Sequence, residues 1–403
     1  MLTVLTPAEA QEAVREAFPP HPTAETVSLD AACGRVLYAP VTAKEYVPDF
    51  DRSTVDGYAL RASDTFGCSD ALPAVLRLRG EVFMGAAAPA ALEPESCMAI
   101  PTGGALPAGA DACAMLEYAE VYGDGTVGVA KPVAPGENLI FRGDDARPGQ
   151  EVLPAGRRLT PQDVGALAAL GVTEVAVCRK PLVGLISTGD ELVPASETPG
   201  PGRVRDVNAP LLRALLQSAG AETGFYGILK DEAALLGATL DKALADCDAV
   251  CISGGSSVGQ ADATCRVIED RGELLFHGVA MKPGKPTICG SVGGKAVFGL
   301  PGHPAAAAIA AQLFVLPHLA RLTGSGGTSH PVPARLTDPV SANHGRAQYM
   351  AVTLEDRGGE TWAKPVRSKS GLITALAGAD GWFCIPRDRE GVPAGETVDV
   401  YLY

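Results

Sequence analysis

The sequence predicts a multidomain protein of α/β and β domains: a central αβα three-layer domain with a mostly parallel sheet, an inserted β-rich domain and a small C-terminal β-barrel-like domain. Three patterns support this prediction. Strand and helix patterns alternate over residues 181–325, short alternating apolar runs with Gly and Pro turns occupy about residues 46–138, and residues 328–403 show only strand patterns. With 403 residues, of which 46% are apolar, the chain can bury more than one core.

Two capped helices indicate a helical linker domain on either side of the β-rich insert. Thr6-Pro7-Ala8-Glu9 is a capping box with proline at the first helical position, so we expect a helix to about Phe18. Thr160-Pro161-Gln162-Asp163 begins a second helix in the same way, and Gly171 ends it. The expected boundaries are residues 1–45 with 139–180 for the linker domain and residues 46–138 for the insert.

Residues 181–327 show the alternation that is typical of a mostly parallel sheet covered by helices on both faces. The predicted strands are Leu182–Ile186, Gly224–Leu229, Ala249–Ile252, Leu274–Val279 and Ala296–Leu300. The predicted helices are near Pro210–Ala219, Glu232–Ala245, Ala263–Arg271 and Ala305–Leu322. A flexible linker, Gly324-Ser325-Gly326-Gly327, is expected to lead to the β domain of residues 328–403.

Composition and charge limit the class of protein. No run of about 18 uncharged apolar residues occurs, and the N-terminus has a helix pattern without signal-peptide features, so we expect a cytoplasmic protein with no membrane partner. The net charge of −14 argues against nucleic acid as a general partner. The 10 cysteines have no paired spacing, which favours buried reduced thiols over disulfides or a metal cluster. An anionic ligand must therefore bind in a local basic pocket.

A glycine-rich turn follows the predicted strand Ala249–Ile252 and precedes a helix pattern. Such a turn can hold a phosphate, because its backbone N–H groups point at the anion and glycine allows close approach. It is neither a Walker loop, since Gln260-Ala261 replaces the required Lys-Ser/Thr, nor a dinucleotide fingerprint, and a plain αβ turn is the alternative. The residues expected to bind are Ser253, Gly254, Gly255, Ser257 and Gly259.

Polar clusters follow all five predicted strands of the αβα domain, where open sheets bind ligands. Glu191, Asp231 and Asp262 supply carboxylates that suit Mg²⁺. Lys282 and Lys285, three residues apart in a proline-stiffened loop, can bind a phosphate or another oxyanion. For each single residue the alternative is a solvated surface side chain, but the joint arrangement is hard to explain by solvation.

Six motifs, in order, resemble those of the molybdopterin molybdenumtransferase family, the bacterial MoeA proteins, which are related to the gephyrin E domain. The resemblance covers essentially the whole chain. The motifs are Phe50-Asp51-Arg52-Ser53-Thr54-Val55-Asp56-Gly57-Tyr58-Ala59, Pro101-Thr102-Gly103, Arg142-Gly143-Asp144-Asp145, Ser187-Thr188-Gly189-Asp190-Glu191-Leu192, the Ser253-Gly254-Gly255 loop through Asp262, and Lys282-Pro283-Gly284-Lys285-Pro286.

The resemblance implies four domains in an elongated homodimer, with the active cleft between the αβα domain of one subunit and the β-rich insert of the other. It implies a reaction in which adenylylated molybdopterin and molybdate yield a molybdenum-loaded dithiolene and AMP, with Mg²⁺ assisting. The family further implies contacts with a molybdopterin adenylyltransferase and with molybdoenzyme chaperones.

The resemblance also assigns residues. Catalytic roles fall on Asp56, Thr102, Asp145, Glu191, Asp231, Asp262, Lys282 and Lys285. Ligand-binding roles fall on the glycine-turn residues and on Gly189, Pro301, Gly302, Arg346 and Ser370. Asp56 has a structural alternative, which is to cap the turn before Gly57.

The chain departs from the family pattern in the expected oxyanion pocket. Pro301-Gly302-His303-Pro304-Ala305-Ala306 replaces the usual Pro-Gly-Asn-Pro-Val-Ser, so a serine hydroxyl is missing, and Ala351 replaces a usual second arginine. A protonated His303 can replace part of the lost interaction. The departures leave open a tungstate-handling paralogue and a catalytically weakened molybdopterin-binding scaffold. A molybdopterin adenylyltransferase is a further alternative, against which the insert and the C-terminal domain argue.

Overall fold

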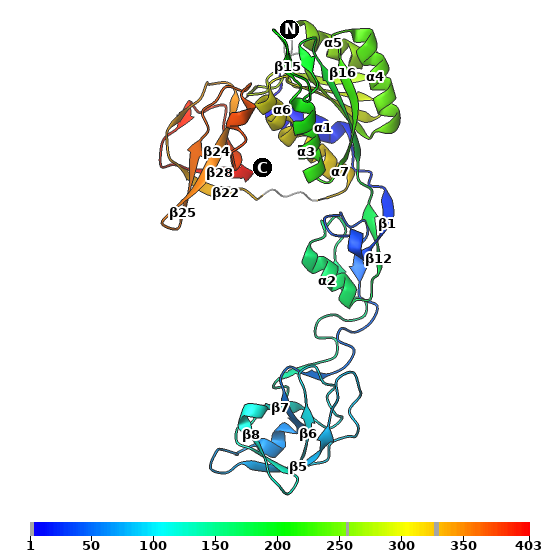
Figure 1. Ribbon diagram of the computed structural model, residues 1–403, viewed down its shortest axis with the longest axis vertical. Coiled ribbons are helices and arrows are strands. Elements are labelled where there is room, and N and C mark those ends of the chain that lie inside the picture. The colour runs from blue at the N-terminus through cyan, green and yellow to red at the C-terminus, as the bar shows by residue number, and fades with distance from the viewer. Residues whose placement is uncertain (1–3, 255–257, 326–329) are drawn as a thin grey trace.

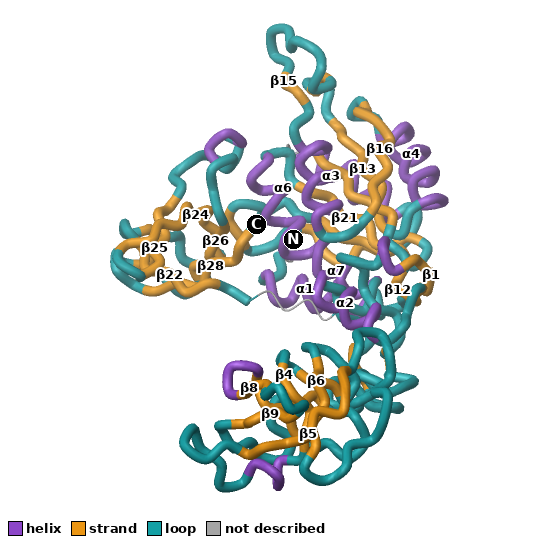
Figure 2. The backbone as a smooth tube through the Cα atoms, turned by 60° about the horizontal axis from the view of Figure 1, so that its bottom comes forward, coloured by secondary structure: helices purple, strands orange, loops and turns teal. Residues whose placement is uncertain are grey.

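The computed structural model describes residues 4–254, 258–325 and 330–403, with the backbone alone for residues 258–262. The molecule is elongated (Figure 1). The αβα domain and the C-terminal β domain lie side by side at one end, the linker segments form the middle, and the β-rich insert forms the other end. The second view shows the same separation and a loop around β15 that projects beyond the αβα domain (Figure 2).

The αβα domain has a six-stranded sheet in the order β16-β13-β17-β21-β20-β18. Its strands are β13 (Leu182–Thr188), β16 (Glu222–Leu229), β17 (Ala249–Gly254), β18 (Glu273–His277), β20 (Ile288–Val292) and β21 (Lys295–Leu300). Its helices are α1 (Pro7–Ala17), α3 (Asn208–Ser218), α4 (Ala233–Asp246), α5 (Val258–Glu269), α6 (Pro304–Ala310) and α7 (Leu316–Leu322). All five strands expected from the sequence are present.

Apolar cores on the two faces of this sheet make the three layers. Side chains of α1, α3 and α6 pack with Val183 and Phe298 on one face, and side chains of α4 and α5 pack with Ile186 and Val250 on the other. The predicted αβα three-layer architecture is confirmed. Within the segment 1–45, α1 joins the αβα core, whereas the following strand pairs with the segment 139–180.

The sequence prediction missed strand β20, which makes part of the sheet antiparallel. β20 pairs antiparallel with both β18 and β21, while β13, β16, β17 and β21 pair in parallel. Gly293 and Gly294, both with positive φ, join β20 to β21 in a tight hairpin. The two antiparallel steps cancel, so β18 still ends at the same edge as the parallel strands.

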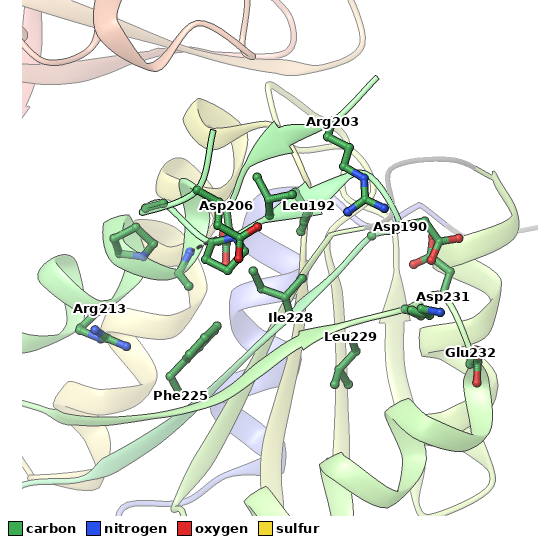
Figure 3. A pocket seen from close by; sticks show the side chains of 18 residues that line it. Asp190, Leu192, Arg203, Asp206, Arg213, Phe225, Ile228, Leu229, Asp231 and Glu232 are labelled. Carbon is green, nitrogen blue, oxygen red and sulfur yellow. Dashed lines mark hydrogen bonds between the residues drawn. The ribbon is translucent and has the colours of Figure 1, made fainter. Parts of the chain in front are cut away.

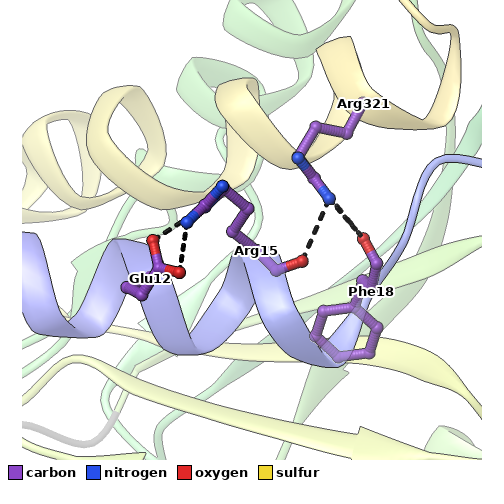
Figure 4. A network of polar contacts seen from close by, with 4 residues as sticks. All are labelled: Glu12, Arg15, Phe18 and Arg321. Carbon is purple, nitrogen blue, oxygen red and sulfur yellow. Dashed lines mark hydrogen bonds and ion pairs between the residues drawn. The ribbon is translucent and has the colours of Figure 1, made fainter.

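The helix after β21 is continuous but contains a π-helical turn, Ala311–Val315, between α6 and α7. Its 19 residues, Pro304–Leu322, have the length and hydropathy of a membrane span. Of the most apolar 18-residue stretch of this helix, however, 67% is buried inside the protein. It is therefore a core helix. Arg321 donates to the backbone oxygens of Arg15 and Phe18, which ties α7 to the end of α1 (Figure 4).

Both predicted capping boxes are present. The Thr6 hydroxyl accepts from the N–H of Glu9 at 3.2 Å, and the Thr160 hydroxyl accepts from the N–H of Asp163 at 3.3 Å. The second box begins helix α2 (Pro161–Ala169) of the linker region. The strands of that region are β1 (Ala24–Ser28), β2 (Val41–Thr42), β11 (Glu151–Leu153) and β12 (Glu174–Cys178), which pair as β1-β12 and β2-β11.

The insert is rich in strands, as predicted, and has its own core around Tyr58, Leu76 and Val127. Its strands are β3 (Arg52–Ser53), β4 (Gly57–Leu60), β5 (Ala74–Glu81), β6 (Ser96–Ile100), β7 (Ala112–Met115), β8 (Ala119–Val121), β9 (Thr126–Val129) and β10 (Leu139–Ile140). Six of them form one sheet in the order β7-β4-β6-β5-β9-β8.

The C-terminal domain is a small closed β structure. Strands β24, β25, β22, β28 and β26 form a ring, because β24 also pairs with β26. The strands are β22 (Val332–Leu336), β23 (Val340–Ser341), β24 (Ala347–Arg357), β25 (Glu360–Pro365), β26 (Gly381–Ile385), β27 (Gly391–Val392) and β28 (Thr397–Leu402). The expected barrel-like fold is confirmed. Of the predicted linker, residues 326 and 327 lie outside the described residues, and Ser325 is tied to helix α7 by a bond to the Ala320 oxygen.

One additional strand joins the two domains. β19 (Met281–Lys282), which belongs to the αβα segment, pairs in parallel with β24 of the ring. The short strands β14 (Leu192–Val193) and β15 (Val204–Arg205) lie on the projecting loop and pair with each other.

We predict that His318 makes the αβα domain sensitive to acid. Its side chain is 2% exposed, both ring nitrogens lack a hydrogen-bond partner, and it lies 5.1 Å from Phe18 and 5.7 Å from Phe298 between ring centroids. Burial, followed by the charges of His21 and Arg321, lowers the pKa of His318 to about 4. Because an unfolded histidine titrates near about 6.5, the folded state loses about 3 kcal/mol as the pH falls from there to 4.

The variant His318→Leu should lose less unfolding free energy between pH 7 and pH 4.5 than the wild type, measured by urea unfolding with far-UV circular dichroism. His344→Leu, at an exposed position, is the control and should retain the full acid sensitivity. Equal acid losses in all three proteins would contradict the prediction.

Candidate functional site

Three contiguous cavities run along the carboxyl edge of the αβα sheet. The lysine cavity, about 700 Å³, includes Lys282 and Lys285. The central cavity, about 820 Å³, includes Ser253 and Gly254, and the outer cavity, about 1070 Å³, includes Asp231. The first two share His303, and the last two share Leu192, Arg203 and Asp206. The three cavities are therefore neighbours along this edge of the sheet.

The lysine cavity lies between the αβα domain and the C-terminal ring. In the pairing of β19 with β24, Lys282 lies opposite Gln348, so the lysine loop is next to Arg346. Gly284, at φ +113°, contacts Met281 so closely that a Cβ would lie 2.2 Å from the Met281 Cε. The cations that line the cavity are Lys282, Lys285, Arg346 and Lys369. This positive cluster in a protein of net charge −14 suits an oxyanion.

A second contact between the domains lies where the lysine and central cavities meet. The Ser370 hydroxyl is 2.9 Å from the His303 Nδ1, and the Ala305 N–H donates to the backbone carbonyl oxygen of Ser370 at 3.1 Å. The backbone of Pro301 and Gly302 is held by the Asn208 amide, which donates to the Gly302 oxygen at 2.9 Å. Pro301 lines the lysine cavity and Gly302 the central cavity.

The central cavity contains the start of the glycine-rich turn. Ser253 and Gly254 end β17 and pair with Ser187 and Thr188 of β13. Gly254 has φ +141°, and a Cβ there would lie 2.0 Å from the Thr188 carbonyl oxygen, so only glycine fits. β17 and α5 follow in the predicted order, and α5 begins at Val258, before the expected Ala263.

Several residues predicted for this turn are not among those whose side chains the structure describes. Gly255 and Ser257 are outside the described residues, as is Ser256. Gly259 and Asp262 lie in α5, where the backbone alone is described. Their expected ligand contacts stay predictions.

Asp206 forms the wall between the central and outer cavities, and the sequence reasoning did not single it out. Its side chain is 4% exposed and accepts from the Ser187 hydroxyl at 2.6 Å. It also accepts from the N–H groups of Asn208 and Ala209, each at 3.1 Å, at the start of helix α3. Because this carboxylate is fully engaged, its role is to position the loop.

The outer cavity has an acidic end. Burial raises the pKa of Asp231, and the negative charges of Asp190 and Glu191 raise it further. Gly189, at φ +150°, allows the Glu191 carboxylate to fold back, since a Cβ would lie 2.8 Å from it. Figure 3 shows Asp190 and Asp231 at one end of the cavity, with Phe225 and Arg213 at the other.

Mutual repulsion of three carboxylates is relieved by a cation, so this end fits a hydrated Mg²⁺. Within the part of the chain whose side chains are described, no group of three His, Cys, Asp or Glu residues is arranged to enclose a metal ion. The predicted set of Glu191, Asp231 and Asp262 therefore stays a prediction, and Asp190 is an additional candidate.

The β-rich insert, which carries Asp56 and Thr102, lies at the opposite end of the molecule (Figure 1) from the αβα and C-terminal domains that line the three cavities. The Asp56 carboxylate accepts from the Thr102 N–H at 2.8 Å, so these two residues form one site, and Asp56 does help to hold a turn. Asp145 is exposed, with its N–H donating to the Val47 oxygen at 3.0 Å. Within one chain the insert cannot complete the cavities.

The residues that the sequence reasoning missed differ in their signals. Asp190 lies inside the recognised motif of residues 187–192, and Lys369 directly precedes Ser370, so the sequence alone could have indicated both residues. Arg203 and Phe225 had no pattern, because their place in the outer cavity depends on the path of a loop and on a strand irregularity.

Three family models match the chain in order. The MoeA N-terminal region (domain I and II) matches residues 5–171, a probable molybdopterin binding domain matches residues 184–321, and the MoeA C-terminal region (domain IV) matches residues 333–403. Together they span most of the chain.

Curated relatives and solved structures match over nearly the full length. The molybdopterin molybdenumtransferase of Bacillus subtilis (strain 168) is 33% identical over 411 residues, covering 100% of this chain and 95% of that protein. The Staphylococcus epidermidis (strain RP62A) enzyme is 30% identical, covering 98% and 96%. The crystal structure of the molybdopterin biosynthesis MoeA protein from Pyrococcus horikoshii OT3 has a TM-score of 0.88 at 33% identity and covers 100% of both chains.

We predict that Gly254→Ala destabilises the αβα domain by about 3 kcal/mol or more, because the new Cβ would overlap the Thr188 oxygen and the φ value is unfavourable for alanine. Gly165→Ala is the matched control. Gly165 lies inside α2 with no atom within 4 Å of an added Cβ, so alanine should stabilise by up to about 1 kcal/mol. Urea unfolding of both variants measures the effects, and a Gly254→Ala protein as stable as the wild type would disprove the close contact.

Proposed function

The chain belongs to the MoeA family and acts in molybdenum cofactor biosynthesis as a molybdopterin transferase, and we propose that it inserts molybdate into adenylylated molybdopterin with release of AMP. The row of three cavities carries this proposal. The lysine cavity has four cations that suit an oxyanion, and the central cavity has the start of the glycine-rich turn, which suits a phosphate. The outer cavity has a cluster of carboxylates. A substrate with a metal-binding end, a pyrophosphate and a nucleotide needs these sites in this order.

The lysine cavity is the proposed molybdate site. Lys282 and Lys285 present ammonium groups from one domain, and Arg346 presents a guanidinium from the other. Charge-assisted hydrogen bonds from these groups hold the oxyanion next to the dithiolene of the pterin. Because the site closes between two domains, water is partly excluded, which strengthens each electrostatic interaction.

The pyrophosphate is proposed to lie in the central cavity. Attack of a water oxygen on phosphorus would break the P–O bond of the pyrophosphate, leaving one phosphate on the pterin side and releasing AMP, and the departing phosphate gains negative charge. Arg203 and the N-terminus of α5 lie where they can stabilise that charge. A bound Mg²⁺ would neutralise phosphate oxygens as the bond breaks, and it would be held by those oxygens together with carboxylates at this end of the site, such as Asp231.

We further propose that the active protein is a homodimer in which the insert of one subunit covers the cavities of the other. The site on the insert carries Asp56 and Thr102, and the exposed Phe83 and Met84, at 65% and 63% exposure, lie on the same domain. Met84 is directly beside this site, because its Cε is 3.4 Å from where a Cβ on Gly103 would be. A partner's αβα domain would cover this apolar pair.

The lysine cavity leaves a second candidate open, a tungstate-handling enzyme. Ala306 and Ala351 line this cavity where the family usually has a serine and an arginine, and His303 bonds Ser370 at its edge. Incubation of the purified protein with adenylylated molybdopterin, Mg²⁺ and either molybdate or tungstate, followed by measurement of AMP and bound metal, tests the transferase function and identifies the metal.

Lys282→Ala or Lys285→Ala should raise the molybdate concentration for half-maximal AMP release by about tenfold or more, because each removes a charged donor to the oxyanion. Lys364→Ala, at an exposed position of β25, is the control and should behave as the wild type. Ala306→Ser should lower that concentration, since a hydroxyl in the cavity adds a hydrogen bond. If Ala306→Ser and His303→Asn both fail to improve molybdate use while tungstate use depends on His303, the molybdate assignment is wrong.

A mixture of two inactive variants should test the shared cleft. Asp56→Asn inactivates the site on the insert, and Asp231→Asn inactivates the site at the edge of the αβα sheet. A dimer with one subunit of each variant therefore keeps one intact shared site. After subunit exchange, AMP release should recover to about a quarter of the wild-type rate. Asp56→Asn mixed with Thr102→Ala is the control and should stay inactive, because both residues belong to the same site on the insert. No recovery in the first mixture, with exchange verified, would show that each subunit works alone.

A further inference from the structure

We infer that the outer cavity holds the adenine of the substrate over the ring of Phe225, beside Arg213. The inference rests on the proposed function and adds the position of the nucleotide. The cavity, about 1070 Å³, has room for a nucleoside monophosphate, since sites for small ligands are commonly about 300–1000 Å³. Its two ends differ, with carboxylates at one end and an aromatic side chain at the other (Figure 3).

An irregularity in the edge strand β16 makes the apolar end. The register of β16 against β13 shifts between the pairs Leu185–Phe225 and Ser187–Ile228, which is a β-bulge at Tyr226 and Gly227. In a regular strand, residues three apart would point to opposite faces. The bulge instead allows Phe225 and Ile228 to line the same cavity, and Gly227 supports it with φ +110°.

Phe225 offers an exposed aromatic ring. Its side chain is 42% exposed, although it lies inside a cavity and next to a well-packed sheet. The Arg213 guanidinium is 5.8 Å from the ring centroid. A planar purine placed on the ring would bury apolar surface and also gain from the nearby cation.

The order of groups along the substrate distinguishes adenine from the pterin, which is also planar. The dithiolene is part of the pterin end, and the pyrophosphate separates that end from the adenine. Since the oxyanion site lies in the lysine cavity, the pterin end must lie toward Lys282. The adenine then lies beyond the central cavity, and Phe225 is in the cavity at that end.

The region shared by the central and outer cavities carries positive charge, which suits the phosphates of the substrate. Arg203 lines both the central and the outer cavity, and Lys230 lines the outer cavity beside Asp231. A phosphate held at Arg203 leaves the ribose and the base to extend along the cavity toward Ile228 and Phe225. The base therefore has one direction in which to lie.

The test compares binding of AMP and ribose 5-phosphate to the full-length protein by isothermal titration calorimetry. The wild type should bind AMP about tenfold more tightly, since only AMP carries the base. Phe225→Ala should abolish this preference and Phe225→Tyr should retain it. Phe66→Ala, at a 63% exposed phenylalanine of the insert, is the matched control and should keep the preference.

Two outcomes would overturn the inference: a wild type that binds both ligands equally, or a Phe225→Ala variant that keeps the preference for AMP. Failure of the proposed function is a separate result. If AMP is never released from adenylylated molybdopterin but the AMP preference depends on Phe225, the nucleotide site stands and the transferase reaction falls. If AMP is released but the wild type binds AMP and ribose 5-phosphate equally, the transferase reaction stands and the nucleotide site at Phe225 falls.

Discussion

The position of the lysine loop is the constraint on which the rest of the site depends. The loop after β18 is held between two other segments by backbone hydrogen bonds. On one side the Ala280 N–H donates to the Leu5 oxygen at 2.7 Å, and on the other the Ala347 N–H donates to the Ala280 oxygen at 2.9 Å. One residue thus joins the N-terminal segment, the αβα domain and the C-terminal ring. Because Lys282 and Arg346 lie on either side of this junction, its geometry sets the distance between the cations.

Local sequence patterns were enough to predict the elements but not the contacts between domains. The capping boxes at Thr6 and Thr160 and the five strands follow from the spacing of nearby residues, and the structure confirms them. β20 was missed because no element was predicted between the strands Leu274–Val279 and Ala296–Leu300, although Gly293-Gly294 makes a hairpin there. The two-residue strand β19 has no pattern of its own, since it exists only because β24 is there to pair with it.

The same distinction applies to the candidate site. Lys282, Glu191 and Ser253 were found because they follow strands, and the ends of parallel strands meet at one edge by geometry alone. Arg203 and Phe225 come from a projecting loop and from a bulged edge strand, and neither position follows from residue spacing. The separation of the insert from the cavities was also beyond local patterns, because it results from how the chain passes twice through the linker region.

The departures at Ala306 and Ala351 change the donors of the lysine cavity more than its charge. Lys369 supplies a cation to the same cavity, so the loss of an arginine leaves four positive groups. The remaining difference lies at His303, whose Nδ1 is bonded to Ser370. If the Ser370 hydroxyl donates, the His303 Nε2 carries the proton and can donate to an oxyanion, whereas the opposite tautomer would present a lone pair to it. An oxyanion bound beside the His303 Nε2 would select the first arrangement, and the contact between the two domains would then take part in ligand recognition.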